Sequence, residues 1–534
     1  LIKSENWQAL NTILEKYKEQ VQTIYIDPPF NTGNDFAYLD KYQNSSWLSL
    51  MENRLNLSRY CLKEVGSIFL HLDYNANYYG RILLDSLYGD CNFRNEIIWK
   101  RLTYKQTQVK GFGVIHDDIF YYTKSDNYLW ENIRINYDYN QIKKYFCWLE
   151  TPEGKNIKLS KNQIDGNEPL PVGRRFALNP LINLNPDRPN LRYELFGFIR
   201  TWKYSKDKMD EYIKQGKVFQ PSKDSLPQIK QYLDESEGMK LNDLWLDISG
   251  VMGGSNEYQG FETQKPENLL KRIIESTSNE SNLIMDFFLG SGTTTAVAQK
   301  LGRKWIGIEM GDHFWTVVMP RMKKVLFYDK SGISKEKDVK ERYNENKAGG
   351  FFKYQILEQY EDTLDNLEIN TLDNEQMELE FGDKYLLRYF LEYETKANPS
   401  LLNIDKLQSP FSYKLKVNLE EVGEPEEMVV DLPETFNYLL GIKVKKVKVR
   451  NSGRKYLFIE GEKEKQEIAI IWREYDANWK EKDYEEDKKF IREELKEWTP
   501  QVVYINGQSI LTPDFEDFRA DIRSIESEFK RLMG

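Results

Sequence analysis

The stretch LIMDFFLGSGTTTAVAQKLGRKWIGIE, residues 283–309, predicts a strand, a tight turn, a helix and a second strand in direct succession. Gly290 and Gly292 flank the turn, where glycine lets the backbone approach a ligand, and the helix that begins near Thr293 offers free N–H groups. The second strand ends in Glu309, and an acid at that place in an open α/β sheet can bind the hydroxyls of a ribose. A G-x-G turn alone is more often structural, but the whole set predicts a nucleoside-binding site.

The glycine pattern narrows the choice of nucleoside. Thr294 and Thr295 stand where a third glycine would complete the G-x-G-x-x-G fingerprint of dinucleotide sites. This departure disfavours NAD and FAD. It favours a ligand without a pyrophosphate, such as S-adenosylmethionine.

A second motif, Asp27-Pro28-Pro29-Phe30, follows the apolar run TIYI at residues 23–26. Proline has no N–H, so the pair leaves the sheet, and the carbonyls around it are free to face a ligand. Asp27 adds a carboxylate acceptor and Phe30 a flat face. Two acceptors and a ring to stack on are what a pocket for the amino group of a planar base requires. The alternative is a strand-ending turn with an incidental acid.

The chain divides into segments of different rhythm. Strand-like runs at 23–27, 67–73, 95–100 and 118–124 and a helix at 47–65, with Gly66 just past its end, predict an α/β domain with a parallel sheet. We expect the following domains. They are a first catalytic part at 1–134, an insert at 135–250, a second catalytic part at 251–328, a linker at 329–350 and an acidic α+β region at 351–534.

Composition excludes several classes of protein. The chain has 534 residues, 40% hydrophobic and 30% charged, without the long apolar run that a membrane span needs. Three scattered cysteines and three histidines disfavour a disulfide framework and a metal site, and they fit a reducing cytoplasm. The net charge of −10 does not indicate a nucleic-acid binder, but residues 151–230 are locally basic and could grip phosphates.

Taken together, the motifs resemble a known family. DPPF at 27–30, TQKP at 263–266 and FxGxGT at 288–293 are similar to the motifs of amino-methylating DNA methyltransferases. Their order, with the amine-binding motif before the cofactor motif and an insert between, resembles the β group of that family. This group includes the modification (Mod) subunits of type III restriction systems. The likeness covers about residues 1–325 and implies a Rossmann-like, S-adenosylmethionine-dependent sheet with an inserted target-recognition domain.

The resemblance also implies a role for individual residues. Asp27 and the Pro28 carbonyl, within the Asp27-Pro28-Pro29-Phe30 motif, would hold the target amine, and Phe30 would stack on a flipped base. The cofactor site would be lined by Asp286, Phe288, Gly290, Ser291, Gly292 and Thr293. Glu309 would bind the ribose of the cofactor, and Lys265 and Pro266 would cover its methionine end. Ser4-Glu5 replace the Gly-Asp that the family carries, with Glu5 as the candidate contact to the adenine of the cofactor.

The target base stays open between adenine and cytosine, because both present a similar amine. Asp-Pro-Pro tends toward adenine in the family, so we expect transfer to the 6-amino group of adenine in duplex DNA. Methylation of a cytosine ring carbon would need a cysteine nucleophile, and no cysteine lies near either motif. The alternatives are the 4-amino group of cytosine, another amine in RNA or protein, and a non-catalytic, cofactor-sensing DNA-binding subunit.

The insert is the expected target-recognition region. We predict DNA contacts from Arg174, Arg175, Arg200 and Lys203, with further candidates in Arg188 and Arg192. The C-terminal region could form a homodimer, hold a restriction or defence subunit, or extend the grip on DNA, and its acidity disfavours the last. Double-stranded DNA is the expected partner, with no membrane and no metal.

Overall fold

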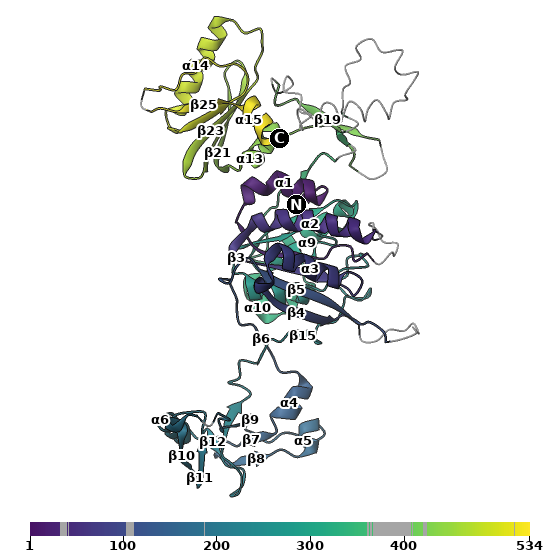
Figure 1. Cartoon of the computed structure of the whole chain (residues 1–534), viewed down its shortest axis with the longest axis vertical. Helices are drawn as coiled ribbons and strands as arrows, with labels where there is room; N and C mark the ends of the chain where they lie inside the picture. Colours follow the sequence, from purple (N-terminus) through teal and green to yellow (C-terminus); the bar gives the residue numbers. More distant parts are fainter. Residues whose placement is uncertain are drawn as a thin grey trace. The chain divides into compact units, whose positions relative to one another are not determined.

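The computed structural model describes residues 1–31, 40, 42–102, 112–185, 187–359, 362–363, 366, 407, 409–419, 424–516 and 518–533. Residues 1–131 together with 243–534 form one compact unit, and residues 132–242 form a second (Figure 1).

The first unit is built on a nine-stranded sheet of described residues with the order β15-β4-β5-β3-β2-β16-β17-β1-β18. These strands are β15 (Leu244–Trp245), β4 (Phe93–Lys100), β5 (His116–Thr123), β3 (Leu62–Leu72), β2 (Val21–Ile26), β16 (Leu283–Asp286), β17 (Lys304–Glu309), β1 (Ile2–Lys3) and β18 (Gln355–Ile356). The expected parallel sheet is correct except at β5, which runs antiparallel to both β3 and β4. The expectation missed this because the direction of a strand depends on the connection that leads to it and not on its composition.

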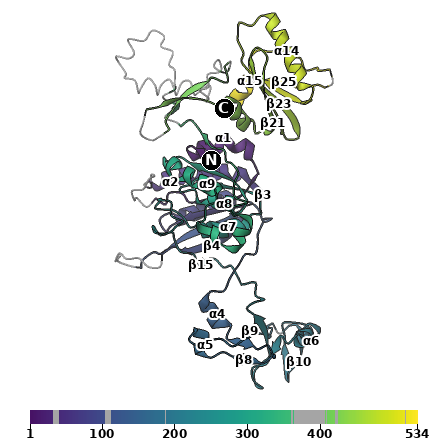
Figure 2. The same cartoon turned by 180° about the vertical axis from the view of Figure 1, so that it is seen from behind.

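Helices cover both faces of this sheet, as an α/β fold requires. The helices α1 (Asn6–Tyr17), α2 (Asn44–Cys61) and α3 (Asn77–Tyr88) pack against one another on one face. On the other face lie α7 (Glu267–Thr277), α8 (Thr293–Lys300) and α9 (Met319–Leu326) (Figure 2). Leu10, Met51 and Leu55 join the strands in one buried hydrophobic core.

The order of the strands reverses between β2 and β16. From β2 the chain passes through α2 to β3 on one side, whereas from β16 it passes through α8 to β17 on the other. Ligands of open α/β sheets bind outside the carboxyl ends of the strands at such a reversal. Asp27 follows β2 and Asp286 ends β16, so both predicted motifs meet at this point.

Two local predictions are wrong. The helix expected at 47–65 ends at Cys61, and Gly66 lies inside β3. A Cβ atom on Gly66 would lie 2.7 Å from Leu62 Cγ, so the glycine serves close packing within the strand and not a helix end. The segment expected to be a linker contains a 3-10 turn, η4 (Gly332–Lys335), and a helix, α10 (Lys337–Arg342). It is anchored to the sheet domain because Ile333 and Val339 are buried.

The second unit contains a five-stranded sheet and two strand pairs among its described residues. The sheet has the order β12 (Val218–Phe219), β13 (Gln228–Tyr232), β9 (Arg174–Pro180), β7 (Trp148–Glu150) and β8 (Asn156–Lys158). The strand pairs are β10 (Arg192–Leu195) with β11 (Phe198–Thr201), and β6 (Arg134–Ile135) with β14 (Met239–Lys240). The helices are α4 (Tyr139–Tyr145), α5 (Lys161–Asp165) and α6 (Lys206–Lys214).

The insert is shorter than the expected 135–250. Residues 243–250 belong to the first unit, because β15 pairs with β4 and Trp99 Nε1 donates to the Ile248 carbonyl at 2.9 Å.

The C-terminal region is α+β, as expected. Its sheet runs in the order β21 (Lys443–Asn451), β22 (Lys455–Lys463), β23 (Gln466–Arg473), β24 (Val502–Ile505) and β25 (Asp521–Ser524). The described helices are α13 (Leu432–Leu440), α14 (Glu481–Leu495) and α15 (Ile525–Met533), and β19 (Lys414–Val417) pairs with β20 (Glu426–Val429). Separate hydrophobic clusters lie under α13 with α15 and under α14. Among the residues described, no helix is long and apolar enough to cross a membrane.

Candidate active site at the carboxyl ends of β2 and β16

The turn after β16 has the backbone that its glycines predict. Gly290 and Gly292 have φ angles of 54° and 78°, a region that favours glycine, and α8 begins immediately afterwards at Thr293. Asp286 supports the turn from below, accepting hydrogen bonds from Phe288 N at 3.0 Å and from Thr294 Oγ1 at 2.5 Å. Burial raises the pKa of Asp286 to about 7, and the charges of Asp27 and Glu309 add to the rise.

Glu309 reaches across to the same turn. Its carboxylate accepts hydrogen bonds from Gly290 N at 2.8 Å and Gly311 N at 3.0 Å, and it lies 3.2 Å from His313 Nε2. Burial alone would raise the pKa of Glu309, but His313 and these backbone donors outweigh it and lower the pKa. The structure thus places the ionised carboxylate of Glu309 beside the glycine turn, whose backbone has positive φ angles. This arrangement fits a ligand that carries a ribose.

The Asp27-Pro28-Pro29-Phe30 element leaves the sheet after β2, as its prolines predict. Asp27 Oδ2 accepts a hydrogen bond from the ammonium of Lys265, whereas Asp27 Oδ1 is buried without a hydrogen-bond partner in the described part of the chain. The Pro29 carbonyl accepts from Trp47 Nε1 at 2.8 Å, and no described residue donates to the Pro28 carbonyl. Two acceptors therefore stay available at this element, and one of them is a buried carboxylate oxygen.

Phe30 is supported by a buried polar chain that sequence reasoning missed. Its ring stacks on the imidazole of His71, with centroids 5.9 Å apart and planes inclined by 25°. His71 Nδ1 lies 2.8 Å from the Tyr25 hydroxyl, and His71 Nε2 lies 3.2 Å from Asp117 Oδ2. Interaction with His71 lowers the pKa of Asp117 even though burial opposes it. A lone histidine in the apolar strand SIFLHLD at 67–73 was the available signal.

The loop before α7 ties the two motifs together. The Lys265 carbonyl accepts a hydrogen bond from Thr293 Oγ1 at 3.2 Å, while its side chain extends to Asp27. Lys265 was expected to cover the methionine end of a cofactor, and the structure instead places its ammonium on the predicted amine-binding carboxylate. Pro266 precedes α7 as its N-cap residue.

A buried ionic cluster fixes this loop against α8, and it too was missed. Glu267 accepts from Lys300 Nζ at 2.9 Å and from Arg321 Nη2 at 3.0 Å, and Lys300 also donates to Asp329 Oδ2 at 2.7 Å. Arg321 Nη1 donates to Thr293 Oγ1 at 2.8 Å and to the carbonyl of Ser291 at 3.2 Å. Because these charges are paired and buried, the cluster holds the glycine turn in one position.

The N-terminal element lies beside the same site. Strand β1 pairs with β17 at Lys3 and Glu309, and Asn6 Nδ2 donates to the Phe287 carbonyl at 2.9 Å. Glu5, the predicted adenine contact, is engaged elsewhere. Its carboxylate caps α1 by accepting from Gln8 N at 3.1 Å and forms an ion pair with Arg54.

The four residues of the insert that were predicted to contact DNA fall into two groups in the structure. Arg174 is ion-paired with Asp234 and Glu235, each at 2.8 Å, and Arg175 donates to the Phe146 carbonyl at 2.7 Å. Arg200 and Lys203 are exposed and have no acidic partner among the described residues. The first two therefore hold the second unit together, and only the last two keep their charge available.

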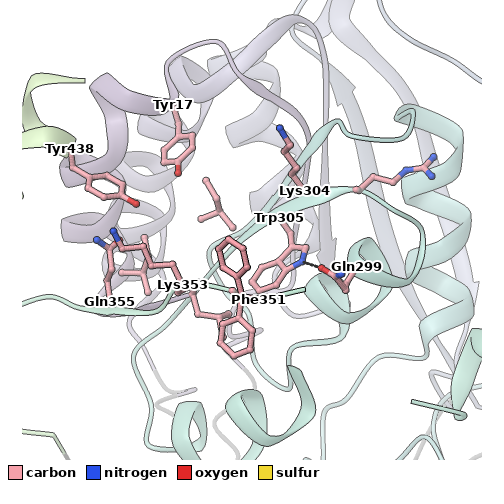
Figure 3. Close-up of a pocket in the computed structure, with 13 residues that line it drawn as sticks. Tyr17, Gln299, Lys304, Trp305, Phe351, Lys353, Gln355 and Tyr438 are labelled. Carbon is pink, nitrogen blue, oxygen red and sulfur yellow. Dashed lines mark hydrogen bonds between the residues drawn. The ribbon is translucent and has the colours of Figure 1, made fainter. Parts of the chain in front are cut away.

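The described structure also contains a cavity away from the site. A cavity of about 280 Å³ opens at the amino end of β17, lined by Tyr17, Trp305, Lys353 and Tyr438 among others, whereas the site is at the carboxyl ends (Figure 3). Within the described ranges no group of three or more His, Cys, Asp or Glu residues could hold a metal ion.

Comparison with known proteins gives a consistent result. A family model described as DNA methylase matches residues 21–320. The probable type III restriction-modification enzyme HindVI Mod subunit of Haemophilus influenzae is 27% identical over 490 residues, which cover 81% of this chain and 64% of that protein. The type II methyltransferase M.EcaI of Enterobacter cloacae is 29% identical over 323 residues, covering 57% of this chain and 65% of that protein. The chain thus spans less than two thirds of the length of these relatives.

Among solved structures, M1.HpyAVI in complex with SAM is 13% identical and superposes with a TM-score of 0.30, over 60% of this chain and 100% of that chain. The family model covers more than half of the chain and includes both the Asp27 motif and the glycine turn. The chain belongs to the DNA methylase family.

Proposed function

We propose that this protein transfers a methyl group from S-adenosylmethionine to the 6-amino group of adenine in duplex DNA. The observation that carries the proposal is the buried Oδ1 atom of Asp27, which has no hydrogen-bond partner in the described structure and lies at the sheet's reversal point beside Phe30. A buried acceptor without a donor is rare, and at a strand end beside a reversal of strand order it indicates a ligand that donates a hydrogen bond.

The residues of this chain have distinct tasks in the proposed reaction. The target base must leave the duplex, since its amine is otherwise inside the stack. Asp27 Oδ1 and the Pro28 carbonyl accept the two amine hydrogens, which draws the nitrogen toward a tetrahedral form and frees its lone pair. Phe30, held by His71, stacks on the base. Lys265 orients the Asp27 carboxylate, and positioning of this kind supplies much of the rate.

The second motif is the proposed cofactor site. Gly290, Ser291, Gly292 and Thr293 form a backbone surface that a ligand can approach closely, with Asp286 and Phe288 beneath it and Glu309 at its side. Bound S-adenosylmethionine would supply an activated methyl group on a sulfonium, so no covalent intermediate with the protein is required. Glu309 is the proposed acceptor for the ribose hydroxyls, and Pro266, in the loop before α7, borders the site.

A second candidate is transfer to the 4-amino group of cytosine. The same two acceptors and the same ring would hold that amine, and the matching family model covers both N6 and N4 methylases. Adenine is preferred because of Asp27, which the family tends to pair with adenine. A non-catalytic, cofactor-sensing subunit fits less well, because the chain keeps both Asp27 and the Gly290-Ser291-Gly292 turn, which such a subunit has no reason to retain together.

The cellular setting is part of the proposal. We infer a modification subunit of a restriction-modification or phage-defence system, acting on DNA in the cytoplasm, because the HindVI relative is described as a Mod subunit. Residues 132–242 are the proposed target-recognition domain. The C-terminal region is the proposed surface for a homodimer or for a restriction or defence subunit.

The direct test is a methyl-transfer assay. The full chain is incubated with labelled S-adenosylmethionine and unmethylated genomic DNA, and the digested nucleosides are identified by mass spectrometry. Label on the 6-amino group of adenine is expected. Label on cytosine would agree with the proposed mechanism but contradict adenine as the target base. Absence of label from DNA would overturn the proposed activity.

A further inference from the structure

The β10–β11 hairpin of the second unit carries an unusual turn. Its last paired residues are Leu195 and Phe198, so Phe196 and Gly197 alone form the turn, with φ angles of 50° and 82°. A two-residue turn with both φ angles positive is normally Asn-Gly, because a bulky side chain is strained there. Phe196 is nevertheless 48% exposed, so burial does not compensate the strain. Strain without a packing role points to a function.

The charges around this hairpin are also distinctive. The second unit has six arginines. Arg134 pairs with Glu237, Arg174 with two acids, and Arg175 donates to backbone carbonyls. The other three, which have no acidic partner among the described residues, lie within 13 residues of one another, on the hairpin or just before it: Arg188, Arg192 and Arg200. Residues 188–201 hold these three arginines and one acid, Glu194, so their net charge is positive and complements a polyanion.

The register puts these arginines on both sides of the hairpin. Arg192 lies opposite Thr201, and Tyr193 lies opposite Arg200, so Arg192 and Arg200 project from opposite faces of the two-stranded ribbon. Arg192 lies three positions before Leu195 and Arg200 two positions after Phe198, so at ~3.3 Å per residue they stand about 10 Å and about 7 Å from the last pair. The major groove of DNA is about 8.5 Å deep and about 12 Å wide, and it admits a two-stranded ribbon. With the tip at the floor of the groove, both arginines would lie near its rim, within reach of the phosphates.

We propose that the β10–β11 hairpin enters the major groove of the DNA substrate, with Phe196 against the bases and Arg192 and Arg200 on the flanking phosphates. This inference rests on the proposed function, in which duplex DNA is the substrate. Apolar side chains contact the methyl group of thymine in that groove, so Phe196 contributes to the choice of sequence. Ile199, 54% exposed beside the tip, extends the apolar surface.

Binding of the full chain to sheared, unmethylated genomic DNA over a range of salt concentrations tests the inference. Arg192→Gln and Arg200→Gln each remove one phosphate contact, so the slope of log K against log salt should fall by about one in each. Phe196→Asn should weaken binding about tenfold without changing that slope, because phenylalanine carries no charge. The Tm of this variant should equal or exceed that of the wild type, because asparagine adopts the positive φ angles of the turn with less strain than phenylalanine. A merely structural role for Phe196 predicts a change in stability and none in affinity.

Matched controls come from the same unit. Lys208→Gln changes an exposed cation that is paired with Glu211 at 2.7 Å, and Tyr145→Asn changes an aromatic residue that is 49% exposed on α4. Both should bind DNA as the wild type does. Unaltered affinity and salt slope in the three hairpin variants would overturn the inference, and so would a wild type that does not bind duplex DNA. Binding with the expected variant pattern but without methyl transfer would support the hairpin and overturn the proposed function alone.

Discussion

Lys265 binds Asp27 across 238 residues of sequence, and this ion pair joins the loop before α7 to the element that follows β2. The backbone of Lys265 is held in turn by Thr293 at the start of α8. The proposed amine-binding and cofactor-binding motifs are thus linked through one lysine, whose side chain is largely buried. The pair also leaves a single oxygen of Asp27 available, which fixes the direction from which a donor must come.

Lys265→Met should reduce the rate of methyl transfer and leave cofactor affinity nearly unchanged. Loss of a charge-assisted hydrogen bond costs about 1.5–3 kcal/mol, so kcat should fall about 10- to 100-fold as Asp27 loses its orientation. Steady-state kinetics and calorimetric titration with S-adenosylmethionine measure the two effects, and Lys265→Arg serves as the charge-conserving control. A weakened cofactor affinity at unchanged kcat would instead assign Lys265 to the methionine end of the cofactor.

Glu309→Ala should weaken cofactor binding about 10- to 100-fold, because the variant removes the acceptor proposed for the ribose hydroxyls. The matched control is Asp312→Ala, since that acid lies three positions further and pairs with Lys3 at 3.4 Å. Calorimetry should show a change for Glu309→Ala only. Equal affinities in both variants and the wild type would remove Glu309 from the site.

Asp286 gives the fold a dependence on pH. Its pKa is about 7 in the folded chain against an ordinary value of 3.8, so the folded state binds a proton that the unfolded state has lost. The stability that this carboxyl contributes is complete below about pH 4 and is lost as the pH rises through about 7. The amide of Asp286→Asn does not titrate, so this variant does not lose stability as the pH rises through about 7. Its amide oxygen can still accept the hydrogen bond from Phe288 N. Its Tm relative to the wild type should therefore be higher at about pH 8 than at about pH 5. A constant difference would show that Asp286 is not held at a raised pKa.

The sequence allowed prediction where local pattern and chemistry coincide. β16, the glycine turn, α8 and β17 follow one another directly in the sequence, and the two prolines after β2 by themselves predict a turn. Both motifs were therefore placed correctly at strand ends. The antiparallel direction of β5 and the strand start at Leu62 were not predicted, because a helical pattern continues past Cys61 and because strand direction depends on the connection and not on composition.

Side-chain partners were the least predictable part. Nothing local marks Lys265 as a partner of Asp27, nor Arg174 as a partner of Asp234 and Glu235, since each pair depends on the folded chain. The segment at 329–350 was predicted to be a linker because polar residues dominate it, whereas Asp329 forms a buried ion pair with Lys300.

Asp27→Asn tests most directly whether the Asp27 carboxylate holds the target amine. The ammonium of Lys265 would retain the amide oxygen and turn the amide NH2 group toward the amine, where two donors oppose each other. We predict that methyl transfer to DNA falls about 100-fold or more while the dissociation constant for S-adenosylmethionine stays within about threefold. Transfer at the wild-type rate, or an equal loss of transfer and cofactor binding, would contradict the proposed role of Asp27.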